Sequence, residues 1–250
     1  AIKKLQTTKF KSAKIQLNEV LENNFKALVE GALLGEYKFT NYKSEKDNKK
    51  IELEIVVLNK NEKLQKILTE SKIISKAVNK TRNMVNTPPA DFYPEIMAKT
   101  AKKLAKDVDI EVKIEGEKFL KENEMNAMLS VGRASVHESK LIHLTYKAQN
   151  PQAKIVLVGK GLTYDSGGLS LKPADFMVTM KADKSGGCAV MSTIWAIAKL
   201  ELPFEVHAIV GAVENMIGGN AYKPDDVLKA KNGKTIEIRN TDGEGRLVLA

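Results

Sequence analysis

The sequence predicts an α/β fold in which helices sandwich a mixed, largely parallel β-sheet. Segments with helix-like and strand-like patterns alternate from residue 94 to residue 213, which is typical of this class. The run at 155–158 is entirely apolar, as in strands that are buried on both faces of a sheet. A second buried strand is predicted at 206–213, and the chain has no internal repeat or low-complexity segment.

The first third of the chain contains one clear strand and one long helix. Residues 51–58 alternate between polar and apolar side chains and then become fully apolar, which predicts a strand. Residues 61–80 place apolar side chains at helical spacing, which predicts an amphipathic helix. The prolines of Asn86-Thr87-Pro88-Pro89 end this helix, because proline lacks an amide donor and clashes with the preceding turn. The segment 43–50 is predicted to be a charged loop.

The later elements follow the same alternation, with apolar side chains on one face of each long helix. Helices are predicted at 94–106, 118–126 and 186–200, and further strands at 108–114 and 141–146.

The domain junction is placed on the long helix and its proline stop. Residues 1–60 are then the final portion of a smaller α/β N-terminal domain, 61–85 a connecting helix, and 86–250 the larger domain.

The composition favours a globular protein and argues against a membrane-spanning protein or a cysteine hydrolase. The chain is 43% hydrophobic and 28% charged, as in soluble globular proteins, and no apolar stretch is long enough to span a membrane. The first residues contain no apolar run of the kind found in secretory signals, so no such signal is expected in them. The single cysteine, Cys188, lies in a run of small residues and is interpreted as packed and inert, because no histidine stands in a recognisable pairing with it.

The net charge of +9 raises the alternative of a nucleic-acid binder. The lysines are spread along the whole chain, however, and only 6% of residues are aromatic. Single-strand binders interleave basic side chains with stacking aromatics, so a solvated lysine-rich surface is the better interpretation.

A glycine-rich segment that follows the strand at 155–158 is the first candidate site. It reads Gly159-Lys160-Gly161-Leu162-Thr163-Tyr164-Asp165-Ser166-Gly167-Gly168. Ligands of open α/β sheets bind beyond the carboxyl ends of strands, so Lys160 and Asp165 are candidates. The spacing fits neither common phosphate-binding glycine motif, which argues against a nucleotide site.

Four carboxylates lie in loop-like contexts in the second half of the chain: Asp165, Asp183, Asp242 and Glu244. Each alone is typical of a turn or a solvated surface. If they converge, their mutual repulsion requires neutralisation, which a pair of divalent cations would supply. Ligation that is rich in carboxylates and free of histidine suits Mn²⁺ or Zn²⁺, with Mg²⁺ as an alternative.

Three segments resemble the signatures of the leucyl (cytosol) aminopeptidase family, in its bacterial type. They are the glycine-rich segment above, the stretch from Leu171-Lys172-Pro173 to Met180-Lys181-Ala182-Asp183, and Asn240-Thr241-Asp242-Gly243-Glu244-Gly245-Arg246. The resemblance extends through Arg82-Asn83-Met84-Val85-Asn86 and Gly31-Ala32-Leu33-Leu34-Gly35, and so covers nearly the whole chain from about residue 27.

The resemblance implies an enzyme with two divalent metal ions. Their ligands would be Lys160 through a neutral amine, Asp165 and Glu244 as bridges, Asp183 at the tighter site and Asp242 at the more exchangeable one. A water activated by both metals would attack the peptide carbonyl. Lys172 would stabilise the oxyanion, and Arg246 would hold a bicarbonate that relays the proton.

The family also implies the biological setting. The substrates would be short peptides, from which leucine and other apolar N-terminal residues are released, and Met180 would line the pocket for the first side chain. The enzyme would be cytoplasmic and would assemble as a homo-hexamer when complete.

Two residues and the length depart from the family pattern. Gly243 replaces an alanine and loosens the backbone between two ligands, and Lys184 replaces a common methionine without expected consequence for the metals. Family members are longer at both ends, so the chain looks like the central part of a longer protein and is expected to have little activity alone. The alternatives are an inactive fragment or relative that acts as a binding or structural module, and a basic nucleic-acid-binding side activity.

Overall fold

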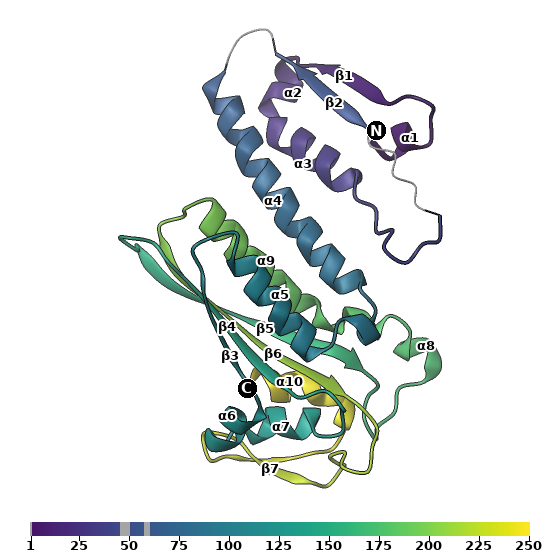
Figure 1. The fold of residues 1–250 in the computed structure, drawn as a ribbon, viewed down its shortest axis with the longest axis vertical. Helices are drawn as coiled ribbons and strands as arrows, with labels where there is room; N and C mark the ends of the chain where they lie inside the picture. The colour runs from purple at the N-terminus through teal and green to yellow at the C-terminus, as the bar shows by residue number, and fades with distance from the viewer. Residues whose placement is uncertain (1, 46–50, 58–60) are drawn as a thin grey trace. The chain divides into compact units, whose positions relative to one another are not determined.

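The structure, a computed structural model, describes residues 2–45, 51–57 and 61–250 (Figure 1). The chain divides into two compact units, Ala1–Lys80 and Thr81–Ala250. The division falls within the segment 61–85 that the sequence analysis assigns to a connecting helix. Part of the charged loop expected at 43–50, and the last residue of the strand expected at 51–58, lie outside the described residues.

Among the described residues, the first unit contains two short strands, three helices and most of a fourth, which continues past Lys80. They are α1 (Ile2–Gln6), β1 (Ser12–Gln16), α2 (Glu19–Asn23), α3 (Phe25–Gly35), β2 (Glu52–Val56) and α4 (Glu62–Asn86). β1 and β2 pair in parallel, with Ser12 opposite Glu52. Their small core contains Leu17, Phe25, Val29 and Leu64.

The long helix α4 confirms the helix expected from residue 61. The Leu64 amide donates to Asn61 Oδ1 over 3.3 Å and so caps the first turn. The helix ends at Asn86, two residues before Pro88, as the lack of proline donors predicts.

The second unit contains the main sheet. Its elements are the 3₁₀ helices η1 (Pro89–Asp91), η2 (Met180–Lys184) and η3 (Thr241–Gly243), the helices α5 (Pro94–Ala105), α6 (Glu117–Glu122), α7 (Asn126–Gly132), α8 (Ala174–Met177), α9 (Ser185–Lys199) and α10 (Glu244–Leu249), and the strands β3 (Glu111–Glu115), β4 (Lys140–Lys147), β5 (Ala153–Asp165), β6 (Phe204–Asn215), β7 (Val227–Lys229) and β8 (Thr235–Glu237).

The main sheet is mixed, with strand order β3-β4-β6-β5. β5 and β6 are parallel neighbours, whereas β4 is antiparallel to both β3 and β6. Three of these four strands therefore run in one direction. The expected α/β class with a mixed, largely parallel sheet is confirmed.

Helices cover the two faces of this sheet unequally. α5 and α9 lie on one face, and α6, α7 and α10 lie beneath part of the other (Figure 1). The core on the second face includes Met128, Val131, Leu162 and Val213. On the first face α9 packs very close to β5, and glycine at position 159 permits this approach. A Cβ on Gly159 would lie only 2.7 Å from Gly187 Cα.

Two sequence expectations were wrong in detail. The helix expected at 118–126 is two helices, α6 and α7, because Glu124 adopts a left-handed conformation (φ 54°) that an α-helix cannot continue through. The run at 155–158 is not buried on both faces. Val156 and Val158 are 54% and 53% exposed, because they project from the part of the second face that no helix of the described residues covers.

Candidate metal centre

The candidate site lies where the parallel strands β5 and β6 end together. Their last residues, Asp165 and Asn215, are register partners. Asn215 Nδ2 donates to Asp165 Oδ1 over 2.8 Å and to the Thr241 carbonyl over 3.0 Å. Asp165 and Asn215 are both buried. The position is the carboxyl end of neighbouring parallel strands, where α/β sheets bind their ligands.

The loop after β5 folds back over Asp165. Gly167 (φ 87°) and Gly168 (φ 65°) adopt left-handed conformations that favour glycine. The Gly167 amide donates to Asp165 Oδ1 over 2.9 Å, and the Lys172 amide donates to the Ser166 carbonyl over 3.0 Å. This backbone path returns Lys172 to the carboxylate that precedes the turn.

Lys172 joins Asp165 to the final segment of the chain. Its Nζ lies 3.0 Å from Asp165 Oδ2 and also contacts Asp242 Oδ1. Thr241 fixes this segment to the loop, since its hydroxyl donates to the Gly167 carbonyl over 2.6 Å and accepts from the Ser170 amide over 2.8 Å. The two halves of the candidate site are thus held together by a threonine as well as by charge.

Lys160 joins the other two carboxylates. From β5, its Nζ lies 2.8 Å from Asp183 Oδ1 and 2.7 Å from Glu244 Oε1. Asp183 belongs to η2, and Glu244 begins α10 and is almost fully buried. Gly245 leaves room for the lysine stem, because a Cβ at that position would lie 2.7 Å from Lys160 Cε.

The arrangement fits divalent cations. One carboxylate oxygen from each of Asp165, Asp242 and Glu244 lies within 4.8 Å of the others. Two buried oxygens, Asp183 Oδ2 and Glu244 Oε2, have no hydrogen-bond partner among the described residues. Buried carboxylate oxygens without donors are costly, and a hard or borderline cation would satisfy them.

The electrostatics of the site are those of crowded carboxylates. Burial raises the pKa of Asp183 and of Glu244 above the usual range, and the nearby Asp165 charge raises both further. Burial lowers the pKa of Lys160, but its hydrogen bonds to Asp183 and Glu244 outweigh that effect and the net pKa is raised. The same balance raises the pKa of Lys172 beside Asp242 and Asp165. In this geometry two ammonium groups therefore offset only part of the negative charge of the four carboxylates.

Lys184, at the end of η2, ties this helix to the segment around Thr87 and Phe92. It is fully buried, and its Nζ donates to the Thr87 carbonyl over 3.2 Å and lies 5.3 Å from the centre of the Phe92 ring. Burial lowers the pKa of Lys184 to about 8. Lys181 Nζ likewise donates to the Asn86 carbonyl. Both lysines anchor the helix that carries Asp183 to the segment that follows α4.

The remaining predicted residues lie around this centre. Arg246, on α10, is exposed and lines a pocket together with Asn240, Asp242 and Gly243. Met180 is half-buried and begins η2, three residues before Asp183. Among the described residues, the ion pairs to the four carboxylates come from Lys160 and Lys172 and not from Arg246. Cys188 is buried, and burial raises its pKa to about 12, as suits an inert thiol.

Sequence reasoning missed three buried residues that hold the site together: Asn215, Thr241 and Tyr222. The Tyr222 hydroxyl donates to the Thr241 carbonyl over 2.6 Å. Asn215 could have been found, because the argument that selected Asp165 at the end of one strand applies equally to the end of the next. Thr241 and Tyr222 act mainly on backbone oxygens, for which no residue pattern is diagnostic.

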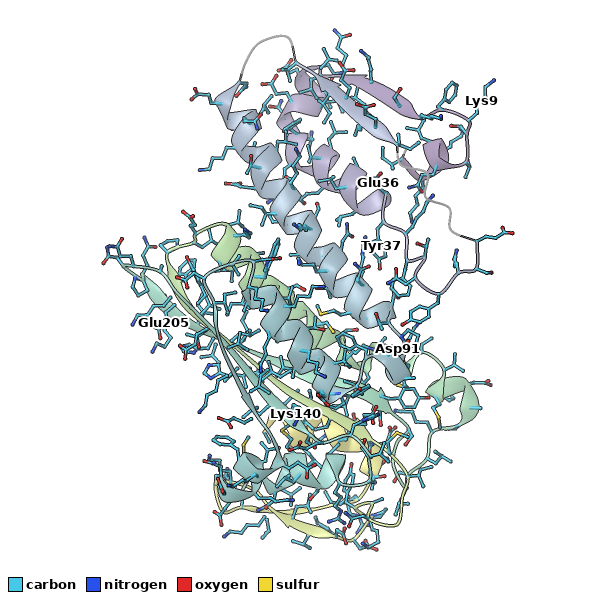
Figure 2. All side chains as sticks on the ribbon, viewed as in Figure 1. Lys9, Glu36, Tyr37, Asp91, Lys140 and Glu205 are labelled. Carbon is cyan, nitrogen blue, oxygen red and sulfur yellow. The ribbon has the colours of Figure 1, made fainter. Side chains whose placement is uncertain are left out.

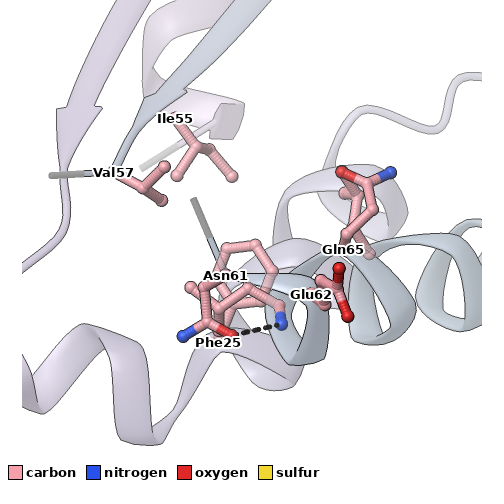
Figure 3. A pocket seen from close by; sticks show the side chains of 8 residues that line it. Phe25, Ile55, Val57, Asn61, Glu62 and Gln65 are labelled. Atoms are coloured by element: carbon pink, nitrogen blue, oxygen red, sulfur yellow. Dashed lines mark hydrogen bonds between the residues drawn. The ribbon is translucent and has the colours of Figure 1, made fainter. Parts of the chain in front are cut away.

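A second pocket, in the first unit, lacks this chemistry (Figure 3). Phe25, Ile55, Leu64 and Leu68 contribute apolar walls, and Glu62 is the one ionisable residue in its described lining. The pocket therefore offers packing surface and no cluster of reactive groups.

The chain is similar to known proteins over most or all of its length. Residues 79–250 match the model of the cytosol aminopeptidase family, catalytic domain. A probable cytosol aminopeptidase of Wolinella succinogenes is 54% identical over 257 aligned positions, covering all of this chain and 53% of that protein. This chain thus spans about half the length of the curated relatives that it matches.

Two solved structures are similar over almost the whole chain. The cytosol aminopeptidase from Coxiella burnetii superposes with a TM-score of 0.86 at 32% identity, covering 99% of this chain and 52% of that one. The bottromycin maturation enzyme BotP in complex with Mn gives a TM-score of 0.84 at 31% identity, covering 95% and 51%.

Proposed function

The chain belongs to the cytosol aminopeptidase family, and from this membership we propose that it supplies the metal centre of a metal-dependent aminopeptidase. The single observation that carries the proposal is the convergence of Asp165, Asp242 and Glu244 within 4.8 Å, at the carboxyl end of β5. The protein would release N-terminal residues from peptides.

The proposed ligands are Lys160, Asp165, Asp183, Asp242 and Glu244. The buried, unpartnered oxygens of Asp183 and Glu244 support this assignment. Two divalent cations, Mn²⁺ or Zn²⁺, would lower the pKa of a water between them and polarise the scissile carbonyl. Manganese is favoured as the first ion to test, because the similar BotP structure is a complex with Mn. Lys160 would act as a ligand in its neutral form.

Lys172 is proposed to donate a hydrogen bond to the carbonyl oxygen as negative charge develops on it. The loop from Gly167 holds its amine beside Asp165 and Asp242, so little reorganisation is needed to present it to a substrate there. Removal of a single oxyanion donor typically costs about 10²–10³-fold in turnover. Arg246, which is exposed and lines a pocket with Asp242, would hold a bicarbonate, and this ion would supply the proton relay of the reaction.

The substrate and setting are proposed from the same family membership. The free α-amine of a peptide would take a ligand position on one of the cations, which would restrict cleavage to N-terminal residues. Met180 would contact the first side chain, with leucine and other apolar residues preferred. The complete protein would act on short peptides in the cytoplasm as a homo-hexamer. Among the described residues, no helix has the length and apolar character that crossing a bilayer requires.

The proposal is tested by measuring metal binding and turnover together. Mn²⁺ binding is followed by isothermal titration, and hydrolysis of leucine p-nitroanilide by absorbance, on this chain and on a longer protein that contains it. We expect the longer protein to bind the ion and turn over, and Asp165→Asn to abolish both. Ion binding without turnover in the longer protein would favour the binding-module alternative. If the longer protein shows no ion binding and no turnover, the proposed metal centre is refuted.

A further inference from the structure

Two histidines meet on the open part of the main sheet, away from the candidate metal centre. His143 lies on β4 and His207 on β6, with His207 directly opposite Thr145. Their neighbour on β5, Val156, is more than half exposed, so solvent reaches this part of the sheet. Glu205, labelled in Figure 2, stands two residues before His207 near the start of β6. The end of β6 at Asn215 is eight residues further on, or about 26 Å along an extended strand.

The geometry of the pair suits a bound cation. His143 Nε2 lies 2.9 Å from His207 Nδ1, and Thr145 Oγ1 lies 3.4 Å and 3.3 Å from these two nitrogens. Ligand atoms about 2.0–2.1 Å from one metal, at square-planar or tetrahedral angles, are about 2.8–3.4 Å apart. The three side-chain atoms are thus spaced as neighbouring ligands would be.

A carboxylate sets the tautomer of one histidine. Glu205 Oε1 lies 3.0 Å from His207 Nε2, and Lys154 Nζ holds the same oxygen over 2.7 Å. The hydrogen bond from Lys154, together with that from His207, lowers the pKa of Glu205 to about 2, so Glu205 is ionised and accepts a hydrogen bond from His207 Nε2–H. His207 Nδ1 then keeps its lone pair, and it lies 2.9 Å from His143 Nε2. A carboxylate behind a histidine is the usual outer partner of a metal-binding imidazole.

The charges around His143 leave it neutral. Burial is the main cause that lowers its pKa, and the Lys113 charge acts in the same direction while Glu111 opposes it. Lys113 is paired with Glu115 over 3.0 Å, so it does not present an uncompensated charge to an approaching cation. A neutral imidazole is the form that binds metals.

We propose that His143 and His207 form a second cation site, for a borderline divalent ion such as Cu²⁺ or Zn²⁺, with the Thr145 hydroxyl beside it and water completing the shell. Imidazole nitrogen selects ions of this class over Mg²⁺ or Ca²⁺. The ion would join β4 to β6 through side chains, on a face that no helix of the described residues covers.

Binding of Cu²⁺, added as the sole metal, distinguishes the histidine pair from the carboxylate centre. The sequence contains three histidines, so a chain purified without a histidine tag has one histidine, His137, outside the pair. None of the proposed ligands of the carboxylate centre is a histidine, so imidazole-nitrogen modulation in pulsed EPR of bound Cu²⁺ reports on the pair. We expect modulation from two imidazoles at one equivalent of Cu²⁺. His143→Gln and His207→Gln should each remove one imidazole and weaken binding at least about tenfold.

The matched control is His137→Gln, which removes a histidine that stacks on Tyr93 with ring centres 4.0 Å apart. It should leave the two-imidazole signal unchanged. Glu205→Gln keeps both nitrogens and should weaken Cu²⁺ binding about tenfold, with folding of every variant checked by circular dichroism. Absence of imidazole modulation in the parent chain, or its persistence in the His143→Gln/His207→Gln double variant, would overturn the proposal and leave a hydrogen-bonded histidine pair.

Discussion

Asn215 and Asp165 are joined by a hydrogen bond of 2.8 Å that links the last residues of two parallel strands. The same Asn215 amide also donates to the Thr241 carbonyl, so it connects the end of β5 with the final loop. Its Oδ1 has no partner among the described residues. Asn215 therefore acts as a positioning residue, because it fixes the orientation of a proposed ligand and does not itself offer charge.

Replacement of Asn215 by leucine should weaken both folding and metal binding. The change removes two buried hydrogen bonds and leaves Asp165 with one donor fewer, which should lower the free energy of unfolding by about 1–3 kcal/mol. Mn²⁺ affinity should fall about 10–100-fold, as is typical when an outer partner of a metal ligand is lost. Denaturant titration and calorimetry measure the two effects. Asn150→Leu, at an exposed position, is the control and should change neither.

The proposed ligands can be separated from nearby surface acids by conservative substitution. Asp165→Asn and Glu244→Gln keep the side-chain volume but remove charge from the cluster of three carboxylates. Each should reduce Mn²⁺ binding, followed by EPR of the free ion, by at least about 100-fold. Asp175→Asn, on exposed α8, should bind as the parent does. Equal binding by all three variants would exclude this cluster as the metal centre.

Lys172→Met should separate catalysis from metal binding. The amine contacts Asp165 and Asp242, so its loss leaves both carboxylates free to bind cations while it removes the proposed oxyanion donor. Mn²⁺ content should be kept, and turnover by the complete protein should fall about 10²–10³-fold. Lys118→Met, whose side chain is 90% exposed, should retain full turnover. Parental turnover in the Lys172 variant would remove this residue from the mechanism.

The fold was largely predictable because local patterns determined most of its elements. The proline pair at Pro88 and Pro89 set the end of α4, and the apolar run before Asn215 marked β6. The exposure of Val156 and Val158 could not be read from residue type, since it depends on which helices cover the sheet. The left-handed conformation lies at Glu124, a residue type that does not favour it, and not at the neighbouring Asn123.

The candidate site was predictable only in part. Strand ends selected Asp165 as a candidate, but its convergence with Asp242 and Glu244 was expected from family resemblance and not from spacing. Spacing does not predict this convergence because the contacts join residues that are distant in sequence. Lys160, for example, contacts both Asp183 and Glu244. Such long-range pairs follow from the packing of η2 and α10 against β5, which local periodicity does not encode.

Cys188 should resist alkylation in the folded protein. Burial raises the pKa of its thiol to about 12, so the thiolate fraction at pH 8 is about 10⁻⁴. Iodoacetamide should therefore leave the native chain unmodified, as followed by intact mass, and should add one group per chain after unfolding in guanidinium. Rapid labelling of the native chain would show that α9 opens readily around this residue.

Two glycines of the last loop should respond oppositely to alanine. Gly243 has φ −100°, and the nearest atom to a Cβ there is Arg246 Nε at 3.7 Å, so alanine fits without strain. Gly243→Ala should raise the free energy of unfolding by about 0.4–1 kcal/mol and leave Mn²⁺ binding unchanged.

At Gly245 a Cβ would lie 2.7 Å from Lys160 Cε and 3.0 Å from its Nζ. Because that side chain is flexible, Gly245→Ala should fold normally but displace the amine, and Mn²⁺ affinity should fall about tenfold. Thermal unfolding and calorimetry on both variants provide the comparison. If Gly245→Ala binds Mn²⁺ as tightly as Gly243→Ala does, the Lys160 amine is not a ligand of the ion.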